Sequence, residues 1–216
     1  DGLSAIRKIR WIRLLYLYPT LITDALLDRI AASEKILPYF DLPLQHAHDD
    51  VLRRMKRAER EADLVALVSR IRSRMPEAVL RAVFIVGFPG ESEAEFQSLY
   101  DFMATTRFDH VGVFTYSDEP EATAYQLPDK IPAPIAEQRR ARLMELQQTI
   151  SREKLATLVG QTVTVLVDDG KAGRTMGQAL EIDGVTHLHG TRPKPGSFAK
   201  VKITRSTEYD LHGKVV

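Results

Sequence analysis

The stretch Arg81-Ala-Val-Phe-Ile-Val-Gly-Phe-Pro-Gly-Glu91 carries the strongest structural signal in the chain. An apolar run ends at Gly87, and an amphipathic pattern opens directly after Glu91. We therefore predict a buried strand, a tight turn and a helix N-terminus. In parallel α/β proteins ligands bind at such junctions. Gly87 and Gly90 allow close backbone approach, and the helix start offers free N–H groups to an anion or a carbonyl. An ordinary strand-to-helix turn is the alternative.

Strand and helix patterns alternate on both sides of this junction, over about the first 155 residues. The expected strands are Trp11–Tyr18, Tyr39–Leu44, Leu80–Val86 and His110–Ser117. Alternation of this kind predicts parallel strands with right-handed crossovers. The fold class is therefore α/β, with four strands that form an open sheet or part of a barrel.

The character of the sequence changes at Gly160. Short alternating segments punctuated by glycine follow, and no helical pattern appears. We predict a separate small all-β domain, most simply a five-stranded barrel. The expected division is 1–157 for the α/β part with its connecting helix, and 158–216 for the β domain.

Composition excludes several classes of chemistry. The chain has 216 residues, a formal net charge of +1 and no cysteine. Disulfides, thiolate metal ligands and cysteine nucleophiles are therefore excluded within it. No apolar run approaches the ~20 residues of a membrane span, and without targeting features the cytoplasm is the default expectation. Because the chain begins at Asp1 rather than Met, we expect it to be the C-terminal part of a larger enzyme.

Polar residues at strand ends are candidates for binding. Gln45 and His46 end the second expected strand, where functional groups of α/β barrels collect; local hydrogen bonding is the alternative. Arg81 could clamp a carboxylate bidentately or lie at an exposed rim. Asp118 and Glu119 follow the fourth strand and could face a basic substrate, although a solvated acidic loop is favoured.

For two further patterns we favour an ordinary structural role over a binding site. The run Arg53-Arg-Met-Lys-Arg57 could hold phosphate, an acidic substrate or nucleic acid, but a solvated helix face is favoured. His46 and His48 have no third ligand nearby, so no metal site is expected.

Taken together, the motifs resemble the radical S-adenosylmethionine (SAM) methylthiotransferases. The resemblance rests on five segments and covers nearly the whole chain: Leu42–Gln45, Met55–Arg57, Ile85–Glu91, Phe114–Ser117 and Glu121–Ala124. The end of the chain resembles the family's TRAM barrel. His46 after Gln45, Arg81 before the turn and the Tyr209–Gly213 ending favour the branch that modifies an aspartate of the twelfth small-subunit ribosomal protein over the tRNA-modifying branch.

The resemblance implies a cofactor, a reaction and partners. A [4Fe-4S] cluster would reduce SAM to a radical that takes a hydrogen from the aspartate β-carbon, and a second cluster would deliver a methylthio group. Gln45, Arg81, Gly87, Phe88 and Pro89 would bind SAM, and His46, Asp118 and Glu119 would contact the substrate. The ribosomal protein would be the partner of a monomeric enzyme that can associate with the ribosome.

The chain departs from the family pattern in several respects. The cysteine motif that holds the cluster and the domain with the second cluster are missing, and the usual Glu-Gly-Thr reads Glu121-Ala-Thr123. The resemblance implies a partial radical-SAM barrel of six strands, of which we expect only the last four here. We expect no catalytic residue and no metal ligand in this polypeptide, and no catalysis by it alone. The alternatives are a tRNA methylthiotransferase and a non-catalytic module that binds RNA or the ribosome.

Overall fold

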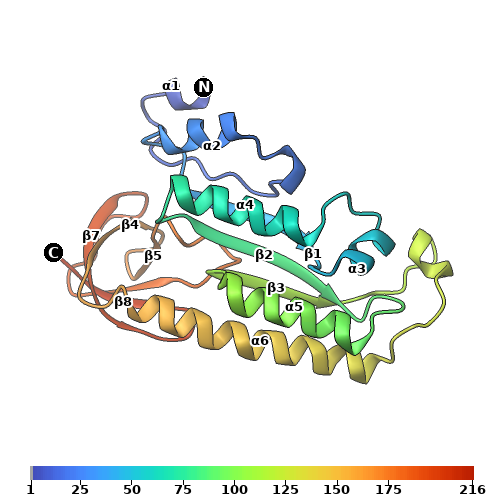
Figure 1. Ribbon diagram of the computed structural model, residues 1–216. Coiled ribbons are helices and arrows are strands. Elements are labelled where there is room, and N and C mark those ends of the chain that lie inside the picture. Colours follow the sequence, from blue (N-terminus) through green and yellow to red (C-terminus); the bar gives the residue numbers. More distant parts are fainter. Residues whose placement is uncertain (1) are drawn as a thin grey trace. The chain divides into compact units, whose positions relative to one another are not determined.

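The computed structural model describes residues 2–216 and divides the chain into two compact units, Asp1–Gln147 and Gln148–Val216. The elements of the first unit, including a helix that continues into the second, follow in chain order (Figure 1): α1 (Gly2–Ala5), η1 (Pro19–Leu21), α2 (Asp24–Ala31), β1 (Tyr39–Gln45), α3 (Asp49–Arg54), α4 (Glu61–Arg74), β2 (Val79–Val86), α5 (Glu93–Thr106), β3 (His110–Thr115), η2 (Thr123–Gln126) and α6 (Ala133–Ala156).

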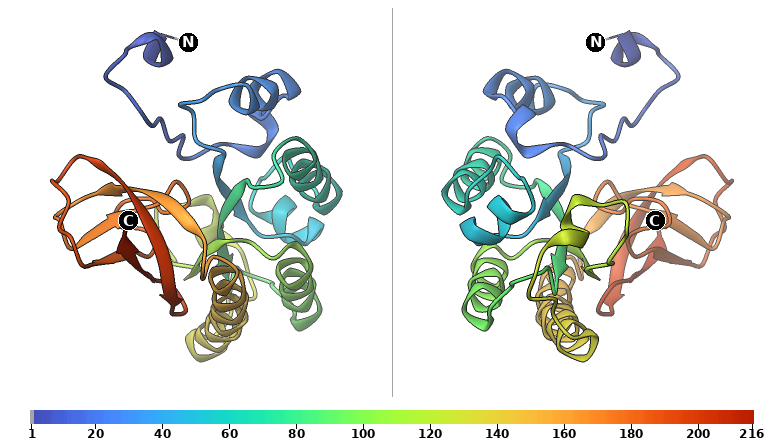
Figure 2. Two further views of the ribbon diagram at one scale, coloured as in Figure 1. Left: turned by 90° about the vertical axis from the view of Figure 1, so that its left-hand side faces the viewer. Right: turned by 90° about the vertical axis from the view of Figure 1, so that its right-hand side faces the viewer.

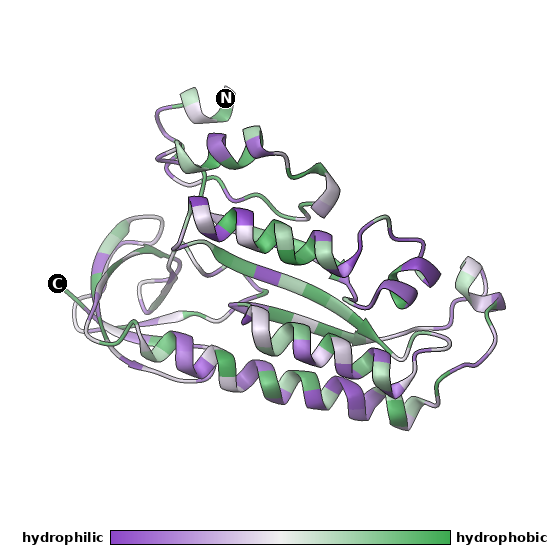
Figure 3. Cartoon of the chain, viewed as in Figure 1, coloured by the Kyte–Doolittle hydropathy of each residue, from purple (hydrophilic) through white to green (hydrophobic). Residues whose placement is uncertain are grey.

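The first unit is built on a parallel sheet of order β1-β2-β3. One face of β2 is fully buried, and the other face is only half-buried. The buried face packs with α4 and α5 in one apolar core, and Figure 2 shows both helices on the same side of the sheet. Hydrophobic colour accordingly runs along the strands in Figure 3, while the helices alternate between the two classes. The predicted parallel α/β architecture is confirmed.

One predicted strand is wrong. The Trp11–Tyr18 segment contributes only an isolated bridge between Ile12 and Ile36, so the sheet has three strands rather than the expected four. The segment bends at Tyr16, which has φ +56°, and the Leu17 N–H donates to the Asp41 carbonyl at 2.8 Å. Side-chain alternation does not by itself create a ladder, because a strand also needs a partner with matching register.

The second unit contains a closed barrel of order β4-β5-β6-β8-β7. Its strands are β4 (Thr162–Val167), β5 (Ala172–Arg174), β6 (Thr186–His189), β7 (Phe198–Ser206) and β8 (Leu211–Val215). All neighbouring pairs are antiparallel except β6 and β8, and a small apolar core fills the barrel. The predicted five-stranded barrel is confirmed.

Within residues 2–216, no helix combines the length and the apolar character that crossing a membrane would require.

Candidate functional site

The turn after β2 has the geometry that its glycines predict. Gly87 and Gly90 adopt φ values of +74° and +76°, a region that residues with a Cβ rarely enter. The Gly90 N–H donates to the carbonyl of Asp129 at 2.9 Å. Ser92 and Glu95 then form a reciprocal capping box that starts α5. The turn is therefore fixed at both ends, and its conformation depends on glycine.

A buried carboxylate organises this turn. Glu91 is 1 % exposed, and its Oε2 accepts hydrogen bonds from the Gly87 N–H at 2.6 Å and from Arg139 Nη1 at 2.7 Å. Arg139 also donates to the Glu91 carbonyl at 2.9 Å. The Nε2 atom of His46 lies 3.1 Å from Glu91 Oε1. Glu91 thus connects the end of β1, the turn and α6.

The tautomer of His46 follows from its two neighbours. His46 Nδ1 accepts the backbone N–H of His48 at 3.0 Å, so Nε2 carries the proton and donates to Glu91. Burial lowers the pKa of His46 and outweighs the opposing effect of Glu91. His46 is 0 % exposed, and its bonds to Glu91 and His48 hold the turn, while its contact with a substrate stays a prediction.

A pocket of about 230 Å³ opens at the carboxyl ends of the three strands. Its lining includes Gln45 from β1, Ile85 from β2, Phe88 from the turn and Tyr116 after β3. The rings of Phe88 and Tyr116 meet edge to face with centroids 5.1 Å apart. Gln45 has φ +69°, a strained conformation for a residue other than glycine that is typical of functional positions. Gln45 and Phe88, both predicted from sequence, therefore share one cavity.

Arg81 lies farther from this pocket. It is on the same half-buried face of β2 as Ile85, four residues away, or roughly 13 Å along the strand. Its Nη1 binds Asp41 Oδ1 at 2.7 Å. The structure therefore supplies Arg81 with a carboxylate partner inside the chain.

The two predicted acidic residues lie on the loop after β3. The Asp118 carboxylate pairs with Lys130 and accepts the Tyr116 hydroxyl, and hydrogen bonding to Lys130 lowers its pKa. Glu119 accepts the Ser117 hydroxyl at 2.6 Å. Asp118 therefore holds the loop beside the pocket, and both Asp118 and Glu119 are exposed.

One group of potential metal ligands lies nearby, formed by His48, Asp50 and Glu95. Both carboxylates already bind arginines: Asp50 pairs with Arg53, and Glu95 lies 3.0 Å from Arg54 Nη1. His48 Nδ1 accepts the Asp50 N–H at the start of α3. The group therefore serves ion pairing and capping in this structure.

Glu95 gives this region a pH-dependent stability. Burial raises its pKa, but hydrogen bonds from Arg54 and Ser92 outweigh burial and lower the pKa to about 2 from 4.5. A depressed carboxyl pKa contributes stability above the ordinary pKa that is lost as pH falls toward the folded value. We expect the free energy of unfolding to fall less steeply between pH 5 and 3 in Glu95→Gln than in the parent, measured by urea denaturation. Glu77→Gln, at an exposed position, is the control, and equal slopes for parent and Glu95→Gln would contradict the assignment.

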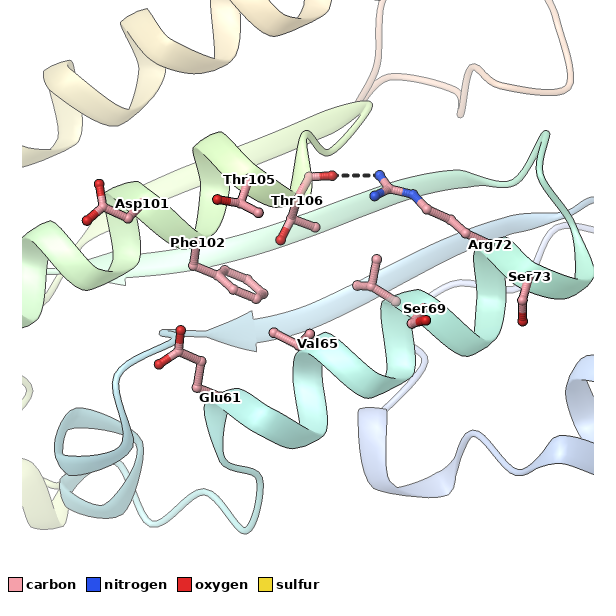
Figure 4. Close-up of a pocket in the computed structure, with 10 residues that line it drawn as sticks. Glu61, Val65, Ser69, Arg72, Ser73, Asp101, Phe102, Thr105 and Thr106 are labelled. Carbon is pink, nitrogen blue, oxygen red and sulfur yellow. Dashed lines mark hydrogen bonds between the residues drawn. The ribbon is translucent and has the colours of Figure 1, made fainter.

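A larger pocket, of about 600 Å³, lies between α4 and α5 (Figure 4). Val65 and Phe102 line it, and Arg72 Nη2 donates to the Thr106 carbonyl at its edge. This pocket sits between the two helices that cover the buried face of the sheet, not at the strand ends, and it gathers none of the predicted site residues.

Sequence reasoning missed several residues of the site. Arg139 lies about 50 positions beyond the turn, and nothing local in the sequence links it to Glu91. Tyr116 lies in the family-like segment Phe114–Ser117, but the sequence alone assigns it no role. Its position directly after a predicted strand was the signal that could have identified it.

Two family models match the chain. The radical SAM superfamily model matches residues 3–103, and the TRAM domain model matches residues 159–216. The α/β unit is therefore similar to proteins of the radical SAM superfamily, and the β barrel is similar to TRAM domains.

Similarity to particular relatives extends over the whole chain. The ribosomal protein uS12 methylthiotransferase RimO of Sorangium cellulosum is 44% identical over 223 residues, covering 100% of this chain and 46% of that protein. RimO of Pelotomaculum thermopropionicum is 46% identical over 225 residues, covering 100% of this chain and 50% of that protein. The chain thus spans about half the length of these curated relatives. The predicted resemblance is confirmed.

A solved structure also overlaps with the chain. Coproporphyrinogen III oxidase (HemN) from Escherichia coli, a radical SAM enzyme, gives a TM-score of 0.49 at 22% identity, covering 68% of this chain and 32% of that one.

Proposed function

We propose that this chain forms the SAM-binding part of a methylthiotransferase that modifies an aspartate of ribosomal protein uS12 at its β-carbon. The observation that carries the proposal is the pocket at the strand ends, where Gln45 and Phe88 meet beside the glycine turn. The names of the relatives, which align over this whole chain, support the substrate. The enzyme would act in the cytoplasm, as a monomer, in contact with the ribosome or its protein.

The residues present fit SAM but not an iron–sulfur cluster. The pocket is smaller than the ~300–1,000 Å³ typical of small-molecule sites, so it suits the nucleoside portion of the cofactor. The Nε atoms of Arg54 and Arg57, two lining residues, are buried without a partner among the described residues. In contrast, the chain has no cysteine to hold a cluster. The clusters, two in our proposal, would need ligands from other polypeptide.

The chain's own residues would bind and orient the cofactor and the substrate protein. Gln45 would hydrogen-bond the ribose, and Gly87, Phe88 and Pro89 would line the adenine and ribose. We also propose Arg81 as a SAM-binding residue. It lies farther from the pocket, on the half-buried face of β2 that carries Ile85, and Asp41 is its counterion. Asp118 and Glu119 would present acidic groups to the substrate protein. SAM bound at a reduced cluster supplies the radical chemistry of this superfamily.

We expect the chain to bind SAM and to leave it intact. Gln45→Ala and Phe88→Ala should each weaken SAM binding about tenfold in isothermal titration calorimetry, equivalent to ~1.4 kcal/mol. Val65→Ala, in the pocket between α4 and α5, is the matched control and should bind like the parent. A parent chain without affinity for SAM would refute the proposal, and formation of 5′-deoxyadenosine under reducing conditions would refute the expected inactivity.

The choice of substrate has its own test. Purified uS12 and bulk tRNA can be compared by fluorescence anisotropy with the SAM-loaded chain. Preference for uS12 supports the proposal. Preference for tRNA would favour a tRNA methylthiotransferase, and strongly salt-dependent RNA binding without SAM affinity would favour a non-catalytic module.

We also propose residues 1–157 and 158–216 as the two domains. In support of this boundary, α6 ends at Ala156 and β4 begins at Thr162, whereas the two compact units divide earlier, within α6 at Gln147.

A further inference from the structure

The basic run Arg53–Arg57 forms one wall of the pocket at the strand ends, because Arg54, Lys56 and Arg57 all line it. The two arginines are neutralised within the chain. Arg54 pairs with Glu95 at 3.0 Å and donates to the Gly90 carbonyl. Arg57 pairs with Glu59 at 3.1 Å and donates to the Pro43 carbonyl. Both guanidinium groups are thus used to hold the walls of the pocket.

Lys56 is different from its neighbours. Its side chain is exposed, and within residues 2–216 no hydrogen bond or ion pair engages its ammonium group. Its backbone has φ +57° just beyond the end of α3, a position where glycine is usual because a Cβ is strained there. A lysine therefore occupies a strained position at which its charge gains no partner from the chain.

The charge of the pocket follows from these contacts. None of the described residues that line it is aspartate or glutamate. With Arg54 and Arg57 paired, the Lys56 ammonium is the uncompensated charge at the pocket wall. The pocket therefore favours a ligand that brings one negative group in addition to its apolar and hydrogen-bonding parts.

We propose that Lys56 binds the side-chain carboxylate of the substrate aspartate and so selects an acidic residue for modification. This inference rests on the proposed function. The reaction proposed above takes place at the aspartate β-carbon, which is bonded directly to the carboxyl carbon. A carboxylate brought to the pocket with that carbon loses part of its hydration, and a cation must replace the lost water. A lysine, a compact charge on a flexible stem, can meet it at the pocket mouth.

The backbone conformation at this position supplies variants that separate charge from folding. Lys56→Gly and Lys56→Asn remove the charge with residue types that tolerate positive φ, so both should unfold at the same denaturant concentration as the parent or a higher one. Lys56→Arg keeps a positive charge. Lys8→Asn, which neutralises another exposed lysine of the same unit, is the matched control.

The experiment measures two affinities for each variant: SAM by calorimetry, and uS12 by anisotropy in the presence of SAM. We expect Lys56→Asn and Lys56→Gly to keep SAM affinity and to bind uS12 five- to tenfold more weakly, with Lys56→Arg and Lys8→Asn close to the parent. Replacing the modified aspartate of uS12 with asparagine should weaken binding to the parent but not to Lys56→Asn, because the two changes remove the same interaction.

The remaining outcomes separate a failure of this inference from a failure of the proposed function. Parent-like binding of uS12 by Lys56→Asn overturns the inference and leaves the proposed function standing. Loss of SAM affinity in Lys56→Asn also overturns it, because the ammonium would then serve the carboxylate of the cofactor. A parent chain that binds neither SAM nor uS12 refutes the proposed function itself.

Discussion

Glu91→Gln is expected to lower the free energy of unfolding by ~3–5 kcal/mol, the range found when one partner of a buried ion pair is removed. The groups around this carboxylate are all donors: the Gly87 N–H, Arg139 Nη1 and His46 Nε2. A glutamine offers one acceptor oxygen, and its amide N–H₂ would face another donor. The Arg139 side chain, 7% exposed, would lose its buried charged partner at 2.7 Å and keep only the exposed Glu93 at 3.4 Å.

Glu93→Gln is the matched control two residues away. Glu93 is 64% exposed and pairs with Arg142 and, at 3.4 Å, with Arg139. Exposed pairs of this kind contribute roughly 0–1 kcal/mol. Urea denaturation of both variants measures the difference, and a Glu91→Gln variant as stable as Glu93→Gln would show that the buried contacts do not hold the turn.

Gly87→Ala is expected to lower the free energy of unfolding by about 2–5 kcal/mol and to weaken SAM binding. A Cβ at Gly87 would lie 2.5 Å from the Ala136 Cβ on α6, and overpacking of this kind costs roughly 1–3 kcal/mol. The positive φ adds roughly 1–2 kcal/mol for a residue with a Cβ. Relief of the clash moves the turn or the start of α6, and either movement disturbs the pocket.

Two variants separate the effect of the Cβ clash on the free energy of unfolding from the effect of the positive φ. Gly90→Ala also places a Cβ at a positive φ, but this Cβ would meet nothing nearer than Arg54 Nε at 3.7 Å. We therefore expect its free energy of unfolding to fall by only about 1–2 kcal/mol. Combining Gly87→Ala with Ala136→Gly removes the clash and should recover most of the overpacking loss. Equal losses in Gly87→Ala and Gly90→Ala would contradict the close packing of α6 on the turn.

The local chemistry of the site could be predicted where it depends on neighbours in sequence. The apolar run, the two glycines and the cap at Ser92 define a strand, a turn and a helix start, because each depends on backbone conformation within a few residues. Gln45 and Phe88 could be proposed as neighbours for a related reason. The carboxyl ends of parallel strands meet at one edge of the sheet, so motifs at strand ends converge there.

The partners of charged residues within the chain could not be predicted in this way. His46, Arg81 and Asp118 were reasonable candidates for binding, yet each has a partner within the chain: Glu91, Asp41 and Lys130. Ion pairing depends on which side chains the fold brings together, and these partners lie 45, 40 and 12 positions away in sequence.

The α/β class, the β barrel and the turn could be predicted from sequence alone, since periodicity, glycine and capping act over short range, and the superfamily followed from the resemblance of its motifs. The three-dimensional contacts were needed to show that Trp11–Tyr18 is not a strand of the sheet and that α6 supplies Arg139 to the turn. It also decided which cation of Arg53–Arg57 is left unpaired at the pocket. Burial and pairing are properties of the space around a side chain, and that space is made by segments far apart in the chain.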